Sequence, residues 1–230
     1  MSYFQTVPRG EPPKPSFELL KPHLEAGHRL ILLKPLSDEP QPGWISEDFP
    51  TVEDVRAHMA KGGNVGVLMR HGMLVIDVNT RRAREGVSPI RQLENSLGVN
   101  LSRGPLVLNG GCGQHFYFKH PDSLVITSPE FPGVKPGQEN VVWPKPSLRF
   151  KHSLPEFPGL KFRTGYKRWL SREQLLLASG SVHPKTQEHC FCEILQDNLA
   201  DAPLVPRELL VRILHKPRYS GRHELLGGRG

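Results

Sequence analysis

Apolar and polar positions follow two kinds of repeat along this chain, and together they predict short strands and helices. Strict alternation, or a short apolar run between turn residues, is typical of a strand, whereas apolar residues spaced three and four apart indicate a helix. Strands are expected at residues 30–33, 65–69, 73–77, 106–108, 115–119, 159–164, 174–178 and 190–195, and helices at 17–26, 51–61, 88–97 and 206–214. The pattern predicts a mixed α+β fold whose central strands carry polar residues at their ends.

The two ends of the chain and one internal stretch lack this periodicity. Residues 1–15 are rich in proline and predict a tail, and residues 217–230 predict a C-terminal tail or linker. Residues 121–158 also carry many prolines, which is typical of a long loop inserted into a domain. The expected organisation is one domain over 16–216 with an insertion at about 121–158.

Composition narrows the class of protein without deciding its partner. The chain has 230 residues, 37% of them hydrophobic, and no apolar run approaches the roughly 20 residues that a membrane helix needs. The first residues lack the basic-then-apolar pattern of a secretory signal, and three cysteines argue against a disulfide framework, so a cytoplasmic protein with no membrane partner is expected. The net charge of +7 suits a polyanion-binding protein and equally a merely soluble basic one.

The run from Met73 to Asn79 combines a buried strand with two polar side chains at its end. Asp77 and Asn79 are two residues apart, so on a strand they point to the same face. Two acids placed in this way hold divalent cations for phosphoryl or nucleotidyl transfer. Here one of them is an amide, which predicts a weakened Mg²⁺ or Mn²⁺ site. The alternative is an ordinary strand end capped by Asp and Asn.

A glycine-rich turn at 109–113 precedes the strand that begins with His115. Glycine lets backbone amides approach a phosphate closely, and a histidine beside such a turn can donate a hydrogen bond to a triphosphate oxygen. Gly113, Gln114 and His115 are therefore candidate nucleotide-binding residues. The alternative is a glycine hairpin with a solvated histidine.

Basic and hydroxyl side chains gather again between residues 160 and 184. Lys161 and Arg163 alternate onto one face of a predicted strand, as phosphate donors would. Ser181 and His183 lie in a predicted turn that could hold a sugar or a phosphate. The alternative is that all of these side chains are simply solvated.

Taken in order, these segments resemble the bifunctional DNA primase/polymerase N-terminal domain family (Prim-Pol), within the archaeo-eukaryotic primase superfamily. The resemblance runs from about Leu19 to Ile194. It rests on the segments Pro42-Gly-Trp44, Asn64-Val-Gly-Val67, Val75-Ile-Asp-Val-Asn79, Gly113-Gln-His-Phe-Tyr-Phe118, Pro158-Gly-Leu-Lys-Phe-Arg163 and Gly180-Ser-Val-His-Pro184. Their order and spacing are more specific than any one of them.

The resemblance implies an RRM-like sheet with flanking helices and a smaller α/β unit, and template-dependent joining of nucleotides with Mg²⁺ or Mn²⁺. By position, Asp77 and Asn79 occupy the family's metal-binding acid pair, and His115 matches the histidine near the incoming triphosphate. Lys161 stands where a third acid is expected, with Arg163 beside it. Asn79 and Lys161 thus both replace acids, and cation repulsion by Lys161 would weaken a metal site by on the order of several kcal/mol at about 4 Å.

Two functions follow as hypotheses. The first is a metal-dependent DNA primase/polymerase domain that acts on nucleoside triphosphates and primer-template nucleic acid in replication, with Asp77, Asn79, His115 and Lys161 at its catalytic site. The second is a catalytically inactive relative that binds nucleotides or single-stranded nucleic acid. A more distant third is a hydrolase or nuclease that uses His115 and His183 without metal. The segment from Tyr219 to His223 resembles the start of a linker toward a further replication module.

Overall fold

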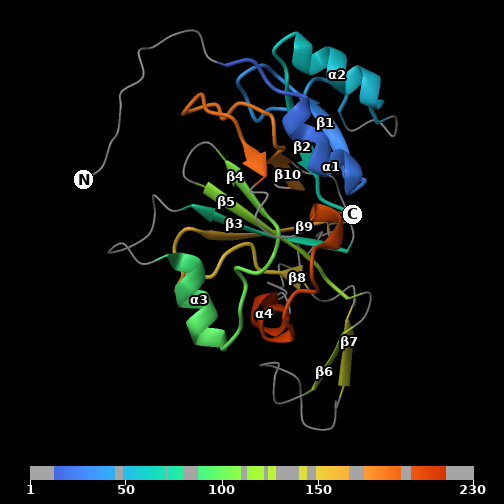
Figure 1. The fold of residues 1–230 in the computed structure, drawn as a ribbon. Coiled ribbons are helices and arrows are strands. Elements are labelled where there is room, and N and C mark those ends of the chain that lie inside the picture. Colours follow the sequence, from blue (N-terminus) through green and yellow to red (C-terminus); the bar gives the residue numbers. More distant parts are fainter. Residues whose placement is uncertain are drawn as a thin grey trace, which may run out of the picture.

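The computed structural model describes residues 13–44, 49–70, 72–79, 88–109, 113–121, 124–127, 140–143, 149–165, 174–192 and 198–215. Its largest element is an antiparallel sheet of five strands (Figure 1). In spatial order these are β11 (Phe191–Cys192), β4 (Leu106–Asn109), β5 (Gly113–Lys119), β3 (Met73–Asn79) and β9 (Leu160–Thr164). The strand with Asp77 is therefore flanked on both sides by other strands.

Alternation along β3 divides its side chains between two faces of this sheet. Leu74, Ile76 and Val78 pack in the main apolar core. The helices α3 (Pro89–Leu97) and α4 (Arg207–Ile213) contribute to the same core and cover that face (Figure 1). Val75 and Asp77 point to the opposite face. The apolar even-numbered residues thus fix the register that aims Asp77 away from the helices.

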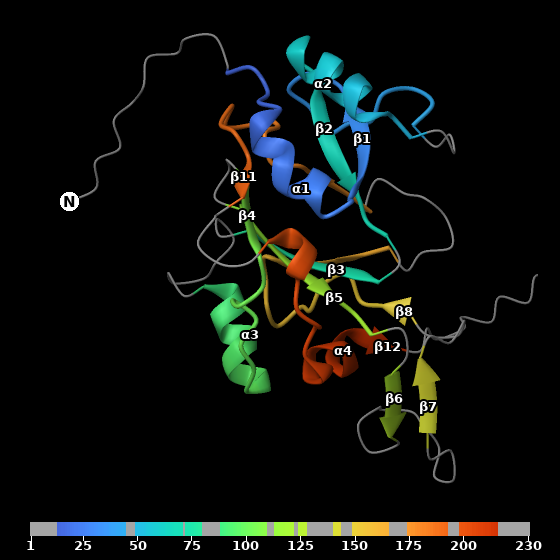
Figure 2. The same cartoon turned by 45° about the vertical axis from the view of Figure 1, so that its right-hand side comes forward.

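A smaller unit lies over the other face of the sheet (Figure 2). Its antiparallel sheet has the order β1 (Arg29–Leu33), β2 (Asn64–Leu68) and β10 (Leu175–Leu177). It also contains η1 (Glu18–Leu20), α1 (Lys21–Glu25) and α2 (Val52–Ala60). All of β2 is buried, because an apolar core covers it on both sides. The predicted division into an RRM-like sheet with helices and a smaller α/β unit is confirmed.

Local sequence explains how two helices begin. Thr51 caps α2: its hydroxyl accepts from the backbone N–H of Asp54, whose carboxylate accepts in return from the backbone of Thr51. The helical segment predicted at 17–26 consists of η1 and α1. Pro22 lies in the first turn of α1, where its missing N–H costs no hydrogen bond.

The segment predicted as a proline-rich insertion contains short strands. A hairpin is formed by β6 (Leu124–Thr127) and β7 (Asn140–Trp143), while β8 (Arg149–Phe150) pairs with β12 (Leu214–His215). Phe150, Leu154 and Phe157 belong to the main core, so the end of the insertion is part of the domain. The N-terminal residues 1–12, residues 193–195 of a predicted strand and the tail from 216 onward lie outside the described residues.

Apolar side chains join the two units at the face that carries Asp77. Val75, Val107 and Tyr117 of the large sheet pack with Met69 and Leu176 of the smaller unit. The 3-10 helix η5 (Leu199–Asp201) closes one side of this junction with Leu199. In the described part of the chain, no helix has the length and apolar character to span a bilayer.

Two histidines are buried at this junction. His23 Nδ1 lies 2.9 Å from His28 Nδ1, and His23 Nε2 lies 3.2 Å from the hydroxyl of Ser179. The ring of His28 stacks on Tyr117 with the centroids 5.7 Å apart. Burial lowers the pKa of His23 well below its usual value, and burial together with the Arg70 charge lowers the pKa of His28 to about 4. Both imidazoles are therefore neutral in the folded protein near pH 7.

We expect the protein to lose stability in mild acid for this reason. In the unfolded chain His28 takes up a proton near pH 6.5, whereas in the folded protein it does so only near pH 4. Its contribution is thus complete above pH 6.5 and is lost as the pH falls toward 4. His28 alone should lower the free energy of unfolding in urea by about 2 kcal/mol between pH 7 and pH 5. His28→Gln should remove this part of the pH dependence and leave the part due to His23, whereas the exposed-site control His152→Gln should leave the whole dependence unchanged.

Candidate functional site

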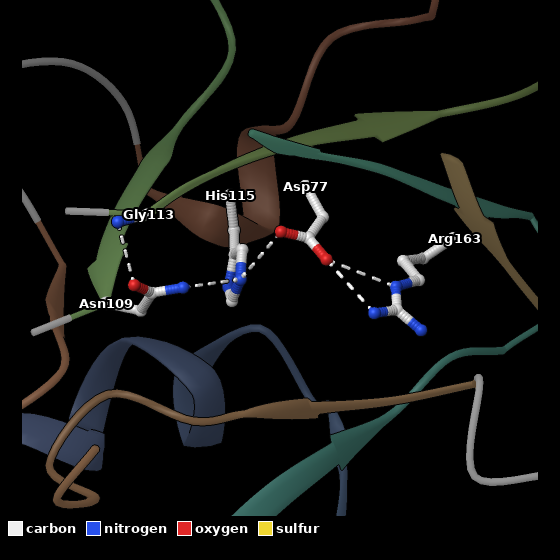
Figure 3. A network of polar contacts seen from close by, with 5 residues as sticks. All are labelled: Asp77, Asn109, Gly113, His115 and Arg163. Atoms are coloured by element: carbon white, nitrogen blue, oxygen red, sulfur yellow. Dashed lines mark hydrogen bonds and ion pairs between the residues drawn. The ribbon is translucent and has the colours of Figure 1, made fainter. Parts of the chain in front are cut away.

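Asp77 and His115 lie side by side in the middle of the large sheet. They are directly opposed in the β3–β5 register, so both side chains point toward the smaller unit. Asp77 Oδ1 is 3.8 Å from His115 Nε2 (Figure 3). The structure therefore brings together the acid and the histidine that sequence reasoning had placed in one site.

Arg163 of β9 reaches the same carboxylate from the other side (Figure 3). Its Nη2 and Nε lie 3.0 and 3.3 Å from Asp77 Oδ2. Both partners are largely buried, with side chains 19% and 16% exposed, so the pair is shielded from solvent and the contact is stronger than a surface ion pair. Arg163 had been predicted as a phosphate donor. In the structure its charge neutralises Asp77.

Asn109 is a site residue that sequence reasoning missed. At the end of β4, its Oδ1 accepts from the backbone N–H of Gly113 at 2.9 Å, and its Nδ2 lies 3.3 Å from His115 Nε2 (Figure 3). A Cβ at Gly113 would lie only 2.2 Å from Asn109 Nδ2, so glycine is required for this contact. An asparagine before a glycine turn was the available signal, because its side chain commonly bonds to the backbone that follows.

These contacts define the state of His115. The Asn109 amide turns its NH₂ toward Nε2, which assigns Nε2 as acceptor and leaves the proton on Nδ1. Nδ1 is buried and has no hydrogen-bond partner within the described residues. Burial lowers the pKa of His115; Asp77 opposes this, while Arg163 and His183 lower the pKa further. The imidazole is neutral near pH 7 and holds one unused donor.

Lys161 and Asn79 lie beside this cluster. Lys161 is directly opposite Asp77 in the β3–β9 register, so it shares the face of Asp77, and it is exposed. Asn79 is the exposed last residue of β3, and alternation puts it on the same face. Gln114 differs, because it neighbours His115 on β5 and therefore points to the opposite face of the sheet.

Ser181 and His183 make different contacts, although they are only two residues apart. The Ser181 hydroxyl is fully buried and bonds to both the N–H and the carbonyl of Val65, at 2.9 and 2.7 Å. These two hydrogen bonds hold the turn that contains Ser181 against β2. His183 lies close enough to His115 for its charge to lower the pKa of that imidazole. Nδ1 of His183 accepts from the backbone N–H groups of Lys185 and Thr186, both at 3.3 Å, so this ring is held by its own turn.

The donor set around Asp77 does not fit a pair of divalent cations. Among the described residues there is no group of three or more His, Cys, Asp or Glu side chains that could hold a metal. Asp77 is already engaged by the guanidinium of Arg163, and an ammonium lies on the neighbouring strand at Lys161. A dication placed there would be repelled by two cations and attracted by one carboxylate, which is unfavourable.

The fold is mixed α+β: an antiparallel sheet has helices on one face and, on the other, a polar cluster covered by a smaller α/β unit. The chain belongs to the Prim-Pol family (bifunctional DNA primase/polymerase, N-terminal), whose sequence profile matches residues 21–205. Its fold is thus that of a primase/polymerase-like nucleotidyltransferase, in a family that generally uses divalent metals.

A solved structure is similar at the level of the fold. It is the archaeo-eukaryotic primase domain (PP-N190) of the primase-polymerase of cyanophage S-2L, with 10% sequence identity and a TM-score of 0.42. The similarity covers 88% of this chain and 100% of that one. No curated protein sequence matches the chain.

Proposed function

We propose that this domain binds nucleoside triphosphates and the phosphates of single-stranded nucleic acid at the Asp77 site, without two-metal catalysis. One observation carries the proposal: the Asp77 carboxylate is held by Arg163 while Lys161 stands on the neighbouring strand. One negative and two positive charges leave the site cationic. Such a site attracts phosphate and disfavours Mg²⁺.

The remaining polar groups fit phosphate recognition. His115 offers a neutral donor at Nδ1, and the ion pair with Asp77 holds the positive charge of Arg163 in a fixed position. Asn79 lies exposed on the same face, and His183 approaches from the smaller unit. The whole chain also carries an excess of basic residues, with a net charge of +7, which supports binding to a polyanionic strand.

Removal of the Lys161 charge is expected to weaken binding. Calorimetric titration of a deoxynucleoside triphosphate into Lys161→Ala should give a Kd at least about tenfold weaker than for the unaltered protein, corresponding to about 1.4 kcal/mol. Lys161 is exposed, so the variant should fold normally. Lys21→Ala, which removes an exposed charge from α1, is the matched control and should bind as the unaltered protein does.

The same titration with EDTA tests the independence from metal. Binding to triphosphate and to a single-stranded oligonucleotide should survive EDTA and weaken with rising salt. Binding that vanishes on chelation would contradict the proposal.

Metal-dependent nucleotidyl transfer is the second candidate. The contact of 3.8 Å between Asp77 and His115 favours it, since the family resemblance implies these two residues beside an incoming triphosphate. Primer extension with Mg²⁺ or Mn²⁺ decides between the two. A product that is lost in Asp77→Ala would establish transfer, whereas binding without product under either metal would leave the binding function.

A further inference from the structure

A pocket opens on the same sheet face as the Asp77 site, near the opposite ends of β3 and β5. It has a volume of about 260 Å³ and lies between the end of α1, the start of β3, the end of β5 and η5. Met73 and Lys119 line it, and they pair across the two strands four residues from Asp77 and His115. It is therefore separate from the site described above.

Two cationic side chains line this pocket. Arg70 is exposed, so its guanidinium can turn toward a ligand. Lys119 is held in place, because its ammonium donates to the carbonyl of Ala200 at 2.7 Å and keeps two further N–H donors. No acidic side chain lines the pocket among the described residues, although the exposed Asp201 follows Ala200 in the chain. The wall is thus positively charged.

The other walls are flat and apolar. The rings of His28 and Tyr117 stack at 16° between their planes, and Leu199 and Ala202 contribute aliphatic surface. His28 uses Nδ1 toward His23. Burial and the Arg70 charge lower the pKa of His28 to about 4, so the guanidinium and the imidazole interact electrostatically. An anion bound between them would offset the Arg70 charge and favour a donor on His28.

We propose that this pocket binds a small phosphate-bearing ligand, with the phosphate between Arg70, Lys119 and His28 and any ring system of the ligand against the apolar wall. The shared chemistry is a phosphate dianion, and its source is either inorganic phosphate or a nucleoside monophosphate. The inference stands apart from the function proposed for the Asp77 site, since none of its groups takes part there.

Calorimetric titrations of the full chain with inorganic phosphate, a nucleoside monophosphate and the corresponding nucleoside test it. We expect binding of at least one phosphate ligand, weakened at least about tenfold in Arg70→Gln, and unchanged in Arg91→Gln. Arg91 is an exposed arginine of α3 on the far face of the sheet, so it is a matched control. Tighter binding of the monophosphate than of inorganic phosphate would identify a nucleotide as the source, and equal binding would identify phosphate.

Lys161→Ala distinguishes this pocket from the Asp77 site. The proposal expects phosphate to bind this variant as it binds the unaltered protein, even if triphosphate binding is lost. The proposal is overturned if no phosphate ligand binds, if Arg70→Gln binds like the unaltered protein, if the nucleoside binds as tightly as its monophosphate, or if Lys161→Ala abolishes the binding.

Discussion

The double variant Asn79→Asp/Lys161→Asp is expected to bind Mn²⁺ at least about 100-fold more tightly than the unaltered protein, a gain of about 2.7 kcal/mol. Both positions share the face of Asp77: Asn79 is on the same strand, and Lys161 lies directly opposite Asp77 on β9. The two substitutions add two carboxylates and remove the ammonium that repels a cation. The added acids also give Arg163 other partners, which lowers the cost of freeing Asp77.

Calorimetric or EPR titration with Mn²⁺ measures this change. Asn198→Asp/Lys151→Asp carries the same change in net charge at positions outside the Asp77 cluster and is the control. Equal affinity in the two double variants would mean that the three positions do not converge on one cation, and the geometry of the site would be wrong. A tight metal site in the unaltered protein would contradict the charge argument itself.

Asn64→Ala is expected to lower the free energy of unfolding by about 3 kcal/mol. Asn64 is fully buried at the start of β2. Its amide accepts from the Val182 N–H at 2.9 Å and donates to the Val182 carbonyl at 2.8 Å and the Ser37 carbonyl at 3.0 Å. Alanine leaves the polar backbone of Val182 buried without these partners, and each such group costs about 1–3 kcal/mol.

Urea unfolding followed by circular dichroism gives the change. Asn64→Asp separates shape from bonding, because it keeps the size and the acceptor but places a carboxylate against two carbonyls; it should be at least as destabilising as alanine. Asn198→Ala removes one cap contact at the exposed residue before η5 and should cost no more than about 1 kcal/mol. A loss below that of Asn198→Ala would show that the Asn64 contacts contribute little.

The core strands, and the face of its strand on which each site residue lies, were predictable because periodicity carries this information. Alternation in 73–79 separates the apolar even positions from Asp77, and the structure has β3 over the same residues. The same rule predicts His115 on a common face with Tyr117. What alternation cannot give is which strands are neighbours, and the contact between Asp77 and His115 depends on that pairing.

The contacts that the sequence could not predict are those between residues that lie far apart along the chain. Arg163 is 86 residues from Asp77, and nothing local distinguishes an arginine that binds phosphate from one that neutralises an acid. Ser181 is 116 residues from Val65, and its hydroxyl forms hydrogen bonds with the backbone N–H and carbonyl of Val65. Asn109 was overlooked for a different reason: its role depends on the conformation of a glycine turn rather than on a pattern of residue types.

Along β3 and β5, core positions alternate with positions that face the smaller unit, and this alternation affects how such a domain can change over generations. Residues of the main core and residues that face the smaller unit occupy alternate places on the same strands. A replacement at an exposed place on the second face, such as Asn79, leaves the core intact, whereas Val75 and Tyr117 on that face are buried between the two units. The charge of this face can therefore change over generations by single substitutions that each yield a folded protein.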